Sequence, residues 1–374
     1  MGAEKEIFGY ADEFGPEKVL YFYSPELNLR GILVVDNTAI GPAIGGIRMV
    51  PDLTTEEVFR LARAMTLKNS IAGIPHGGAK GGIIGDPMAP NKHELIRAYA
   101  EFLRPHQDYI PGPDMGLDER CMATIRDKTG RACGLPQELG GIPIDEIGST
   151  GYGVAEAAEV AAGYISLEMG TATAAIEGFG AVGKAAFRFL ASKGVKVVAI
   201  CDSKGAIYDP KGLNYEGVVV IEPETGRPAR PWNREYKGGQ ALTVTELFKL
   251  DVDILVPGAR PDVITMENVR DINARMIVPG ANIAVTAEAE KYLTDKGVLV
   301  VPDFVANAGG VIAVAVEWKG GTAEESFQTI KERIRQNVKA VLDLAYREKI
   351  CPSEAAERLA KERVREAMRA RRRT

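Results

Sequence analysis

The sequence predicts an α/β protein of two domains, in which an N-terminal α/β domain precedes a doubly wound domain of the Rossmann type and C-terminal helices follow. The chain has 374 residues, 45% of them hydrophobic, which is enough to build two cores. From about residue 148 strands and helices alternate, and after Trp318 the apolar spacing becomes helical. We therefore expect domains at 1–147 and 148–319, with residues 320–374 as helices that pack back on the first domain.

The N-terminal domain is expected to begin with two strands and a long helix. Residues 19–23 and 31–35 are rich in β-branched and aromatic residues and are bounded by turn formers, as strands usually are. The run Thr54-Thr55-Glu56-Glu57 is typical of a capping box and predicts the start of a helix. The apolar stripe of that helix is formed by Val58, Leu61, Ala62 and Met65.

Lys68 lies three residues beyond Met65, on the margin of this stripe. A buried ammonium group is costly unless an anion partners it. Lys68 is therefore either a lysine that reaches water or a core carboxylate, or a lysine that binds the carboxylate of a ligand.

Lys80 is enclosed by two pairs of glycines in the run Gly77-Gly78-Ala79-Lys80-Gly81-Gly82. Because glycine loses more conformational entropy on folding than other residues, the run indicates backbone placed close to a ligand, with the amine directed at it. His76, just before the run, is expected to be a packed or hydrogen-bonded scaffold residue.

A dinucleotide fingerprint occurs at Gly178-Phe179-Gly180-Ala181-Val182-Gly183. Residues 171–177 are expected to form a strand before it, residues 181–193 a helix after it, and residues 195–201 an apolar strand that ends at Asp202. In such a β-α-β unit the glycines let a pyrophosphate approach the helix N-terminus, and the acidic residue can bind the adenosine ribose. The alternative is a tight strand-to-helix turn without a ligand. A lysine amine close to a nicotinamide would imply redox chemistry on a carbonyl or an amine.

Three more apolar runs, at 252–256, 276–278 and 298–301, end in loops that contain Pro or Gly. If these runs are parallel strands, the loops lie along the carboxyl edge of the sheet, where doubly wound folds bind ligands. Asn282 and Asn307 are then candidates for contacts to the nicotinamide half, although loop asparagines are also ordinary turn formers. The C-terminal helices follow, with a second one starting near Ser353. The first has an apolar face made of Phe327, Ile330, Ile334, Val338, Val341 and Ala345.

The composition argues against several classes of function. The net charge of -5 does not favour binding to nucleic acid or an anionic membrane. No apolar run reaches transmembrane length, and residues 1–6 lack an apolar signal region, so we expect a cytoplasmic protein. The four cysteines form no C-x-x-C pair and there are only three histidines, so we expect reduced thiols and no metal site.

Seven motifs in this order carry a family resemblance over nearly the whole chain. The chain resembles the glutamate/leucine/phenylalanine/valine dehydrogenases. The motifs are Gly45-Gly46-Ile47-Arg48, Lys68, residues 77–83 with Lys80, Pro111-Gly112-Pro113-Asp114-Met115-Gly116, Thr150-Gly151-Tyr152-Gly153-Val154, the glycine fingerprint and Asn307-Ala308-Gly309-Gly310-Val311.

The resemblance implies oxidative deamination of an L-amino acid to a 2-oxo acid and ammonium, with a nicotinamide cofactor, no metal and a homo-oligomeric enzyme. It implies that the N-terminal domain binds substrate and forms the oligomer. In the matching positions Lys68 holds the α-carboxylate near Gly45 and Gly46, Lys80 is catalytic, Asp114 relays protons and Thr150 reaches the nicotinamide carboxamide. A desolvated Lys80 near a second cation should have a lowered pKa, which allows a neutral amine to act as a base.

Two positions address the substrate. In glutamate-specific relatives a lysine directly before Gly-Gly-x-Arg and a serine after Asn-Ala-Gly-Gly-Val hold the side-chain carboxylate, and here those positions are Ile44 and Val314. A carboxylate facing Ile and Val would lose its solvation without compensation. The pocket therefore resembles the leucine and phenylalanine branch, although residues 149–153 and 201–205 read more like the glutamate branch.

The cofactor and the rival functions remain open at this stage. Asp202 would repel a 2′-phosphate and favours NAD, whereas Ser203 and Lys204 could bind that phosphate if Asp202 turned away, so NADP is possible. The rivals are a glutamate dehydrogenase that uses another residue such as Arg48 for the γ-carboxylate, a non-catalytic dinucleotide-binding regulator, and a hydroxy-acid dehydrogenase. The last class generally uses a histidine as acid and base, and no histidine here has a suitable context.

Overall fold

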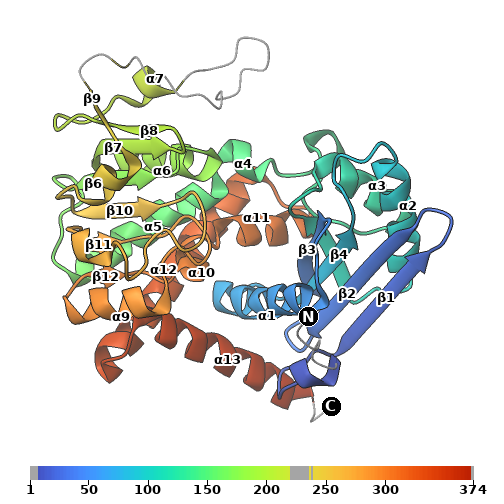
Figure 1. The fold of residues 1–374 in the computed structure, drawn as a ribbon. Helices are drawn as coiled ribbons and strands as arrows, with labels where there is room; N and C mark the ends of the chain where they lie inside the picture. The colour runs from blue at the N-terminus through green and yellow to red at the C-terminus, as the bar shows by residue number, and fades with distance from the viewer. Residues whose placement is uncertain (1–6, 220–235, 237–238, 372–374) are drawn as a thin grey trace. The chain divides into compact units, whose positions relative to one another are not determined.

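The structure is a computed structural model that describes residues 7–219, 236 and 239–371. The chain forms two compact units (Figure 1). Unit 1 comprises Met1–Pro143, Val314–Ala323 and Glu357–Thr374, and unit 2 comprises Ile144–Ala313 and Glu324–Ala356. Residues 1–6, on which the expectation of a missing signal region rests, lie outside the described residues. The two-domain α/β fold expected from the sequence is confirmed.

Unit 1 contains a five-stranded mixed sheet in the order β1-β2-β4-β3-β5. Its strands are β1 (Lys18–Ser24), β2 (Leu29–Asn37), β3 (Ala43–Val50), β4 (Gly77–Ile84) and β5 (Tyr109–Pro113). β2 is antiparallel to β1 and β4, whereas β3 runs parallel to β4 and β5. The strands predicted at 19–23 and 31–35 are β1 and β2, the blue hairpin in Figure 1.

Both faces of this sheet are covered by helices. The helical elements of the N-terminal part are η1 (Ile7–Tyr10), α1 (Thr55–Ala72), α2 (Lys92–Leu103), α3 (Glu119–Thr129) and η2 (Gln137–Leu139). On one face Ile32 and Val34 of β2 pack with Val58 and Ala62 of α1. On the other face α2 and α3 bury a larger core around Tyr99 and Tyr109.

The glycine run around Lys80 forms the central strand β4. Gly78, Lys80 and Gly82 alternate onto one face of the strand. A Cβ atom at Gly78 would lie 2.0 Å from the backbone nitrogen of Thr66 in α1, and one at Gly82 would lie 2.6 Å from Leu53 Cδ2. These glycines therefore let α1 approach the strand, and they leave Lys80 enclosed between them. Close packing is thus one reason for these two glycines, and the closeness of this backbone to a ligand stays a prediction.

Helix α1 begins as the sequence predicts, but its buried face is more polar than expected. The Thr54 side chain accepts a hydrogen bond from the Glu57 backbone nitrogen at 3.1 Å, which caps the helix. Leu61 and Met65 are only half-buried, whereas Thr66 and Asn69 are fully buried. Asn69 donates to the carbonyls of Ile44 and Gly77, at 3.2 and 2.7 Å, and so ties α1 to β3 and β4. A search for apolar periodicity cannot detect such a face.

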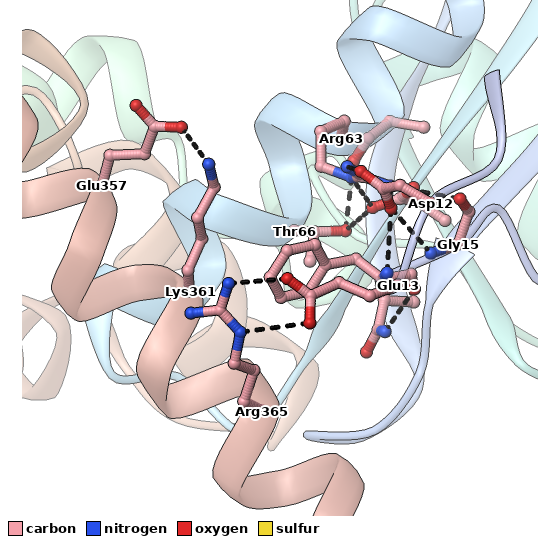
Figure 2. Close-up of polar contacts among 12 residues, drawn as sticks. Asp12, Glu13, Gly15, Arg63, Thr66, Glu357, Lys361 and Arg365 are labelled. Carbon is pink, nitrogen blue, oxygen red and sulfur yellow. Dashed lines mark hydrogen bonds and ion pairs between the residues drawn. The ribbon is translucent and has the colours of Figure 1, made fainter.

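A cluster of charged residues fastens the N-terminal segment to α1 (Figure 2). Arg63 donates to both oxygens of Asp36, which is completely buried on β2, and to both oxygens of Asp12. Glu13, next to Asp12, pairs with Arg365 at 2.6 Å. Arg365 lies in the last part of helix α13 (Pro352–Arg371), so these ion pairs join the two ends of the chain within unit 1.

Unit 2 contains a seven-stranded sheet in the order β12-β11-β10-β6-β7-β8-β9. Its strands are β6 (Thr173–Glu177), β7 (Lys196–Asp202), β8 (Gly205–Tyr208), β9 (Gln240–Leu242), β10 (Ile254–Pro257), β11 (Met276–Ile277) and β12 (Leu299–Val300). The five predicted strands are present and parallel. β8 and β9 were not predicted, and they add an antiparallel edge.

The helices of unit 2 alternate with these strands, and the last helices extend across the boundaries between the residue ranges of the units. The helical elements that complete the chain are α4 (Ile144–Ile147), α5 (Ser149–Tyr164), α6 (Ala181–Ser192), α7 (Tyr215–Val218), α8 (Val244–Phe248), η3 (Val269–Asp271), α9 (Ala287–Asp295), α10 (Asp303–Ala306), α11 (Gly309–Trp318) and α12 (Ala323–Glu348). Among the described residues, no helix has both the length and the apolar character needed to cross a membrane.

The C-terminal helices are distributed between the units, whereas the sequence led us to expect residues 320–374 on the first domain. Most of α12 groups with unit 2. Its Arg335 donates to the buried carboxylate of Glu156 in α5 at 2.9 Å, and Lys193 binds the same carboxylate at 2.7 Å. These ion pairs give a physical reason for that grouping. Val314, in contrast, groups with unit 1 although it lies within the range expected for the second domain.

Candidate active site

Lys80 and Asp114 meet across strand β3. Lys80 Nζ lies 2.8 Å from Asp114 Oδ2, and the two side chains are 6% and 22% exposed. The strand between them offers space at Gly46, where a Cβ atom would lie 2.8 Å from the Asp114 Cβ and 2.6 Å from the Pro113 carbonyl oxygen. The glycine therefore allows Asp114 to reach Lys80.

Arg48 and Glu57 extend this pair into a four-residue ion network. Arg48 Nε donates to Asp114 Oδ2 at 2.9 Å, and Arg48 Nη1 donates to Glu57 Oε1 at 2.6 Å. Arg48 belongs to β3 and Glu57 to the first turn of α1. The network thus joins residues of β3, β4 and α1 to the segment that follows β5.

The network tunes the proton affinity of both catalytic candidates. Burial lowers the pKa of Lys80; the Asp114 carboxylate opposes this shift and the Arg48 guanidinium adds to it. Burial alone would raise the pKa of Asp114, but the charges of Lys80 and Arg48 outweigh it and hold that pKa below its ordinary value. Lys80, whose pKa is lowered, therefore lies beside a carboxyl group whose pKa is also lowered.

The other substrate-side candidates belong to the same unit. Lys68 is half-buried on α1, the helix that also carries Glu57. Ile44 on β3 is 3% exposed and Val314 on α11 is 8% exposed. Gly45 lies so close to β4 that a Cβ atom would be 1.7 Å from the Ala79 carbonyl oxygen, which gives it a packing role; substrate contact by Gly45 and Gly46 stays a prediction.

His76 occupies a scaffold position, as the sequence led us to expect. Its side chain is buried, and its Nδ1 lies 3.0 Å from the Pro42 carbonyl oxygen. Burial lowers its pKa, so the ring is favoured in its neutral form.

The glycine fingerprint forms the turn between β6 and α6 in unit 2. Gly178 has a φ of 89°, and a Cβ atom at Gly183 would lie 2.0 Å from the Gly178 carbonyl oxygen, so both positions require glycine. Gly180 is the N-cap of α6, where no side chain caps the helix and a Cβ atom would meet nothing within 4 Å. Ala181 and Val182 follow in the first turn. This open helix N-terminus fits a pyrophosphate group.

Phe179 in the fingerprint and Asp202 at the end of β7 could make different contacts with a dinucleotide. Phe179 is 3% exposed and its ring packs near Phe187, so a ligand could meet only its backbone. Asp202 ends β7, and its Oδ1 accepts a hydrogen bond from the Lys204 backbone nitrogen at 2.8 Å. Ser203 lies within the same turn to β8. Binding of the adenosine ribose by Asp202 and Ser203 stays a prediction.

Asn282, Asn307 and Thr150 gather at the carboxyl edge of the parallel strands. Asn307 Nδ2 donates to Asn282 Oδ1 at 2.9 Å. Helix α11 starts at Gly309, two residues after Asn307, next to α5. A Cβ atom at Gly310 would lie 3.1 Å from Thr150 Oγ1. The structure therefore brings together three residues that the sequence suggested separately for the nicotinamide half.

From the sequence, no role in the site was expected for Glu57 and no role at Asp114 was expected for Arg48. Glu57 was interpreted only as part of a capping box, and its carboxylate instead binds Arg48. The spacing in the sequence could have indicated the contact of Arg48 with Asp114. Arg48 follows Gly46 by two residues, and residues two apart on a strand lie on the same face.

The chain matches two family models. Residues 140–372 match the model described as glutamate/leucine/phenylalanine/valine dehydrogenase, and residues 16–131 match the model described as the dimerisation domain of Glu/Leu/Phe/Val dehydrogenase. Together these two ranges cover most of the chain.

Curated relatives and solved structures are similar over most of their length. A glutamate dehydrogenase of Aeropyrum pernix is 41% identical, with 90% of this chain and 85% of the relative covered. An NAD-specific glutamate dehydrogenase of Staphylococcus aureus is 36% identical, with 83% and 77% covered. The crystal structure of L-tryptophan dehydrogenase from Nostoc punctiforme superposes with a TM-score of 0.75 at 27% identity, covering 95% of this chain and 98% of that one.

Proposed function

Because the chain belongs to the glutamate/leucine/phenylalanine/valine dehydrogenase family, we propose that it catalyses the reversible NAD-dependent oxidative deamination of an L-amino acid with an apolar side chain. The observation that carries the reaction is the buried pair of Lys80 and Asp114. The products are the 2-oxo acid, ammonium and the reduced cofactor.

The pair supplies the proton chemistry that this reaction requires. A nicotinamide cofactor, when bound, would supply the acceptor for the hydride that leaves Cα of the substrate. Asp114 accepts a proton from the substrate amine, and the lowered pKa of Lys80 lets its neutral amine activate the water that attacks the imino carbon. Asp114 then returns a proton to the departing ammonia. Lys68, on the helix that covers Lys80, holds the α-carboxylate of the substrate.

The dinucleotide is proposed to bind unit 2. The N-terminus of α6 takes the pyrophosphate, Asp202 and Ser203 take the adenosine ribose, and Thr150, Asn282 and Asn307 take the nicotinamide half. Asp202 would repel a 2′-phosphate, which supports NAD over NADP, and one relative is named as NAD-specific. The match to a dimerisation domain supports assembly as a homo-oligomer.

The apolar substrate rests on Ile44 and Val314. Both side chains are nearly buried, both belong to unit 1 with Lys80, and neither can pair with a carboxylate. The similarity to a tryptophan dehydrogenase is consistent with an apolar substrate in this fold. The leucine and phenylalanine branch is therefore our assignment for the pocket.

Glutamate is the second candidate, because two relatives similar in sequence are named glutamate dehydrogenases. Arg48 is less suited to bind its γ-carboxylate, since two protein carboxylates already pair with it. Formation of reduced cofactor should be measured with leucine, valine, phenylalanine, tryptophan and glutamate, each with NAD and with NADP. Turnover of an apolar amino acid with NAD supports the proposal, and turnover of glutamate alone selects the second candidate.

A further inference from the structure

Arg48 binds the same oxygen of Asp114 as Lys80 does. Arg48 Nε lies 2.9 Å from Asp114 Oδ2, and Lys80 Nζ lies 2.8 Å from that atom. Both cations therefore bind Oδ2, and in these two contacts neither of them binds Oδ1.

Arg48 is itself held from two sides. Its Nη1 donates to Glu57 Oε1 at 2.6 Å, and the Glu57 backbone is fixed by the cap that Thr54 provides at 3.1 Å. The Arg48 side chain is 18% exposed, so little of it is free to move into water. Because the guanidinium is planar and its donors point in fixed directions, binding to Glu57 at the start of α1 fixes the direction in which Arg48 donates to Asp114.

We propose that Arg48 is a positioning residue for Asp114: it occupies Oδ2 together with Lys80, so that Oδ1 is the oxygen that takes the proton from the substrate amine, and Glu57 holds Arg48 in that orientation. The inference rests on the proposed function, because it assigns the oxygen that acts in that reaction. It gives the arginine of the Gly45-Gly46-Ile47-Arg48 motif a role in catalysis rather than in binding the substrate side chain.

Burial lowers the pKa of Lys80, and the charge of Arg48 adds to that shift. The charged groups that face Lys80 are Asp114 after β5, Arg48 on β3 and Glu57 on α1. The positive charge of Arg48 disfavours the protonated form of both Lys80 and Asp114. If Arg48 is replaced by a neutral residue, the pKa of each group should therefore rise.

The test compares Arg48→Lys, Arg48→Gln and Glu57→Gln with two matched controls. Lysine keeps the charge of Arg48 but cannot donate in two fixed directions, and glutamine removes the charge. The controls are Arg60→Gln and Glu56→Gln, which change the same residue types at exposed positions of α1. All variants are made in the full chain and assayed with the best amino acid substrate of the wild type.

Arg48→Lys should lower kcat about 100-fold, because the acceptor oxygen is misplaced, while KM changes less than about threefold. Glu57→Gln should show a smaller loss of the same kind, and both controls should match the wild type. A kcat of Arg48→Lys within about twofold of the wild type would overturn the proposal.

A second readout does not depend on turnover. The rate at which formaldehyde and a borohydride reagent methylate Lys80 is followed against pH by peptide mass spectrometry. In Arg48→Gln the midpoint should move up by about one pH unit. Loss of kcat with an unchanged midpoint would assign Arg48 a merely structural role and reject the proposal. A wild type that deaminates no amino acid would refute the proposed function, and the midpoint would still decide whether Arg48 is coupled to Lys80.

Discussion

Lys80 carries the proposed chemistry at the scale of single residues, and its removal is the simplest test. Lys80→Ala should lower turnover at least about 100-fold, since general acid and base groups typically contribute that much. Cofactor binding should stay nearly unchanged, because Lys80 belongs to unit 1. Asp114→Asn, which keeps the shape and removes the proton acceptor, should behave similarly. Steady-state kinetics and NADH titration check both, with exposed Lys211→Ala as control; more than about a tenth of wild-type turnover in Lys80→Ala would reject the role.

The pKa of Lys80 predicts the shape of the pH profile. Deamination needs neutral Lys80, so kcat/KM should rise with pH as the lysine loses its proton. Because burial and Arg48 lower that pKa, the rise should be centred below the ordinary lysine value of about 10.4. A pH series of kcat/KM for the free enzyme measures the midpoint, and a midpoint at or above that value would contradict the assignment.

The sequence named candidate residues for this site but not the contacts between them. Lys68, Lys80 and Asp114 were named from motifs, because such motifs keep their residue types at fixed positions. The link from Glu57 through Arg48 to Asp114 joins positions far apart in sequence, and only the register of β3 against β4 and β5 brings them together. The pairing register of these strands could not be predicted from the sequence alone.

At the scale of elements, the close contact between α1 and β4 is required to bury Lys80. Gly78→Ala should destabilise the protein by at least about 2 kcal/mol, because the new Cβ would overlap the Thr66 backbone. Gly163→Ala is the matched control: it lies in helix α5 with nothing within 4 Å of a Cβ atom, and should be neutral or slightly stabilising. Urea unfolding measures both, and equal stability of Gly78→Ala and the wild type would refute the packing role.

A second prediction at this scale concerns the charged cluster of Figure 2, which joins the N-terminal segment to α1 and α13. Arg63→Ala leaves the completely buried Asp36 without its guanidinium partner and should cost about 3–5 kcal/mol. Lys361→Ala removes a partly exposed pair with Glu357 within α13 and should cost less than about 1 kcal/mol. The difference between their unfolding free energies is the quantity to measure. Similar values for the two variants would mean that Asp36 does not depend on Arg63.

Elements with strong apolar patterns were predicted well, and those with unusual composition were not. β6, β7 and the apolar face of α12 follow ordinary periodicity. β4 was not recognised as a strand because glycine is a poor strand former, and it is stable here because neighbouring strands and α1 enclose it.

At the scale of the whole molecule, the candidate residues for substrate and for dinucleotide belong to different units. Every proposed substrate residue belongs to unit 1 and every proposed dinucleotide residue belongs to unit 2. The residue ranges expected from the sequence include Val314 in the second domain, whereas Val314 groups with unit 1. Helix α11 starts among the dinucleotide candidates and ends with unit 1. Glu317, on the same helix, accepts hydrogen bonds from the backbone of Leu135 and Ile142 at 3.1 and 2.9 Å, which attaches this end of α11 to unit 1.

The pocket assignment predicts that specificity can be redirected. Ile44→Lys together with Val314→Ser should raise kcat/KM for glutamate and lower it for leucine, because a carboxylate gains partners and an apolar side chain loses contacts. The double variant should exceed the sum of the single effects, since both new side chains would bind one carboxylate. Kinetics of the three variants with both amino acids test this, and purely additive effects would contradict a shared pocket.

The most direct measurement of the central claim is the ratio of kcat/KM for leucine to that for glutamate in the wild-type enzyme with NAD. Burial of an apolar side chain contributes about 1.5–3 kcal/mol, and glutamate must in addition desolvate an unpaired charge. At about 1.4 kcal/mol per tenfold, the ratio should exceed about 100. A ratio below one would contradict the apolar pocket and assign the enzyme to glutamate, and no turnover with any amino acid would contradict the dehydrogenase itself.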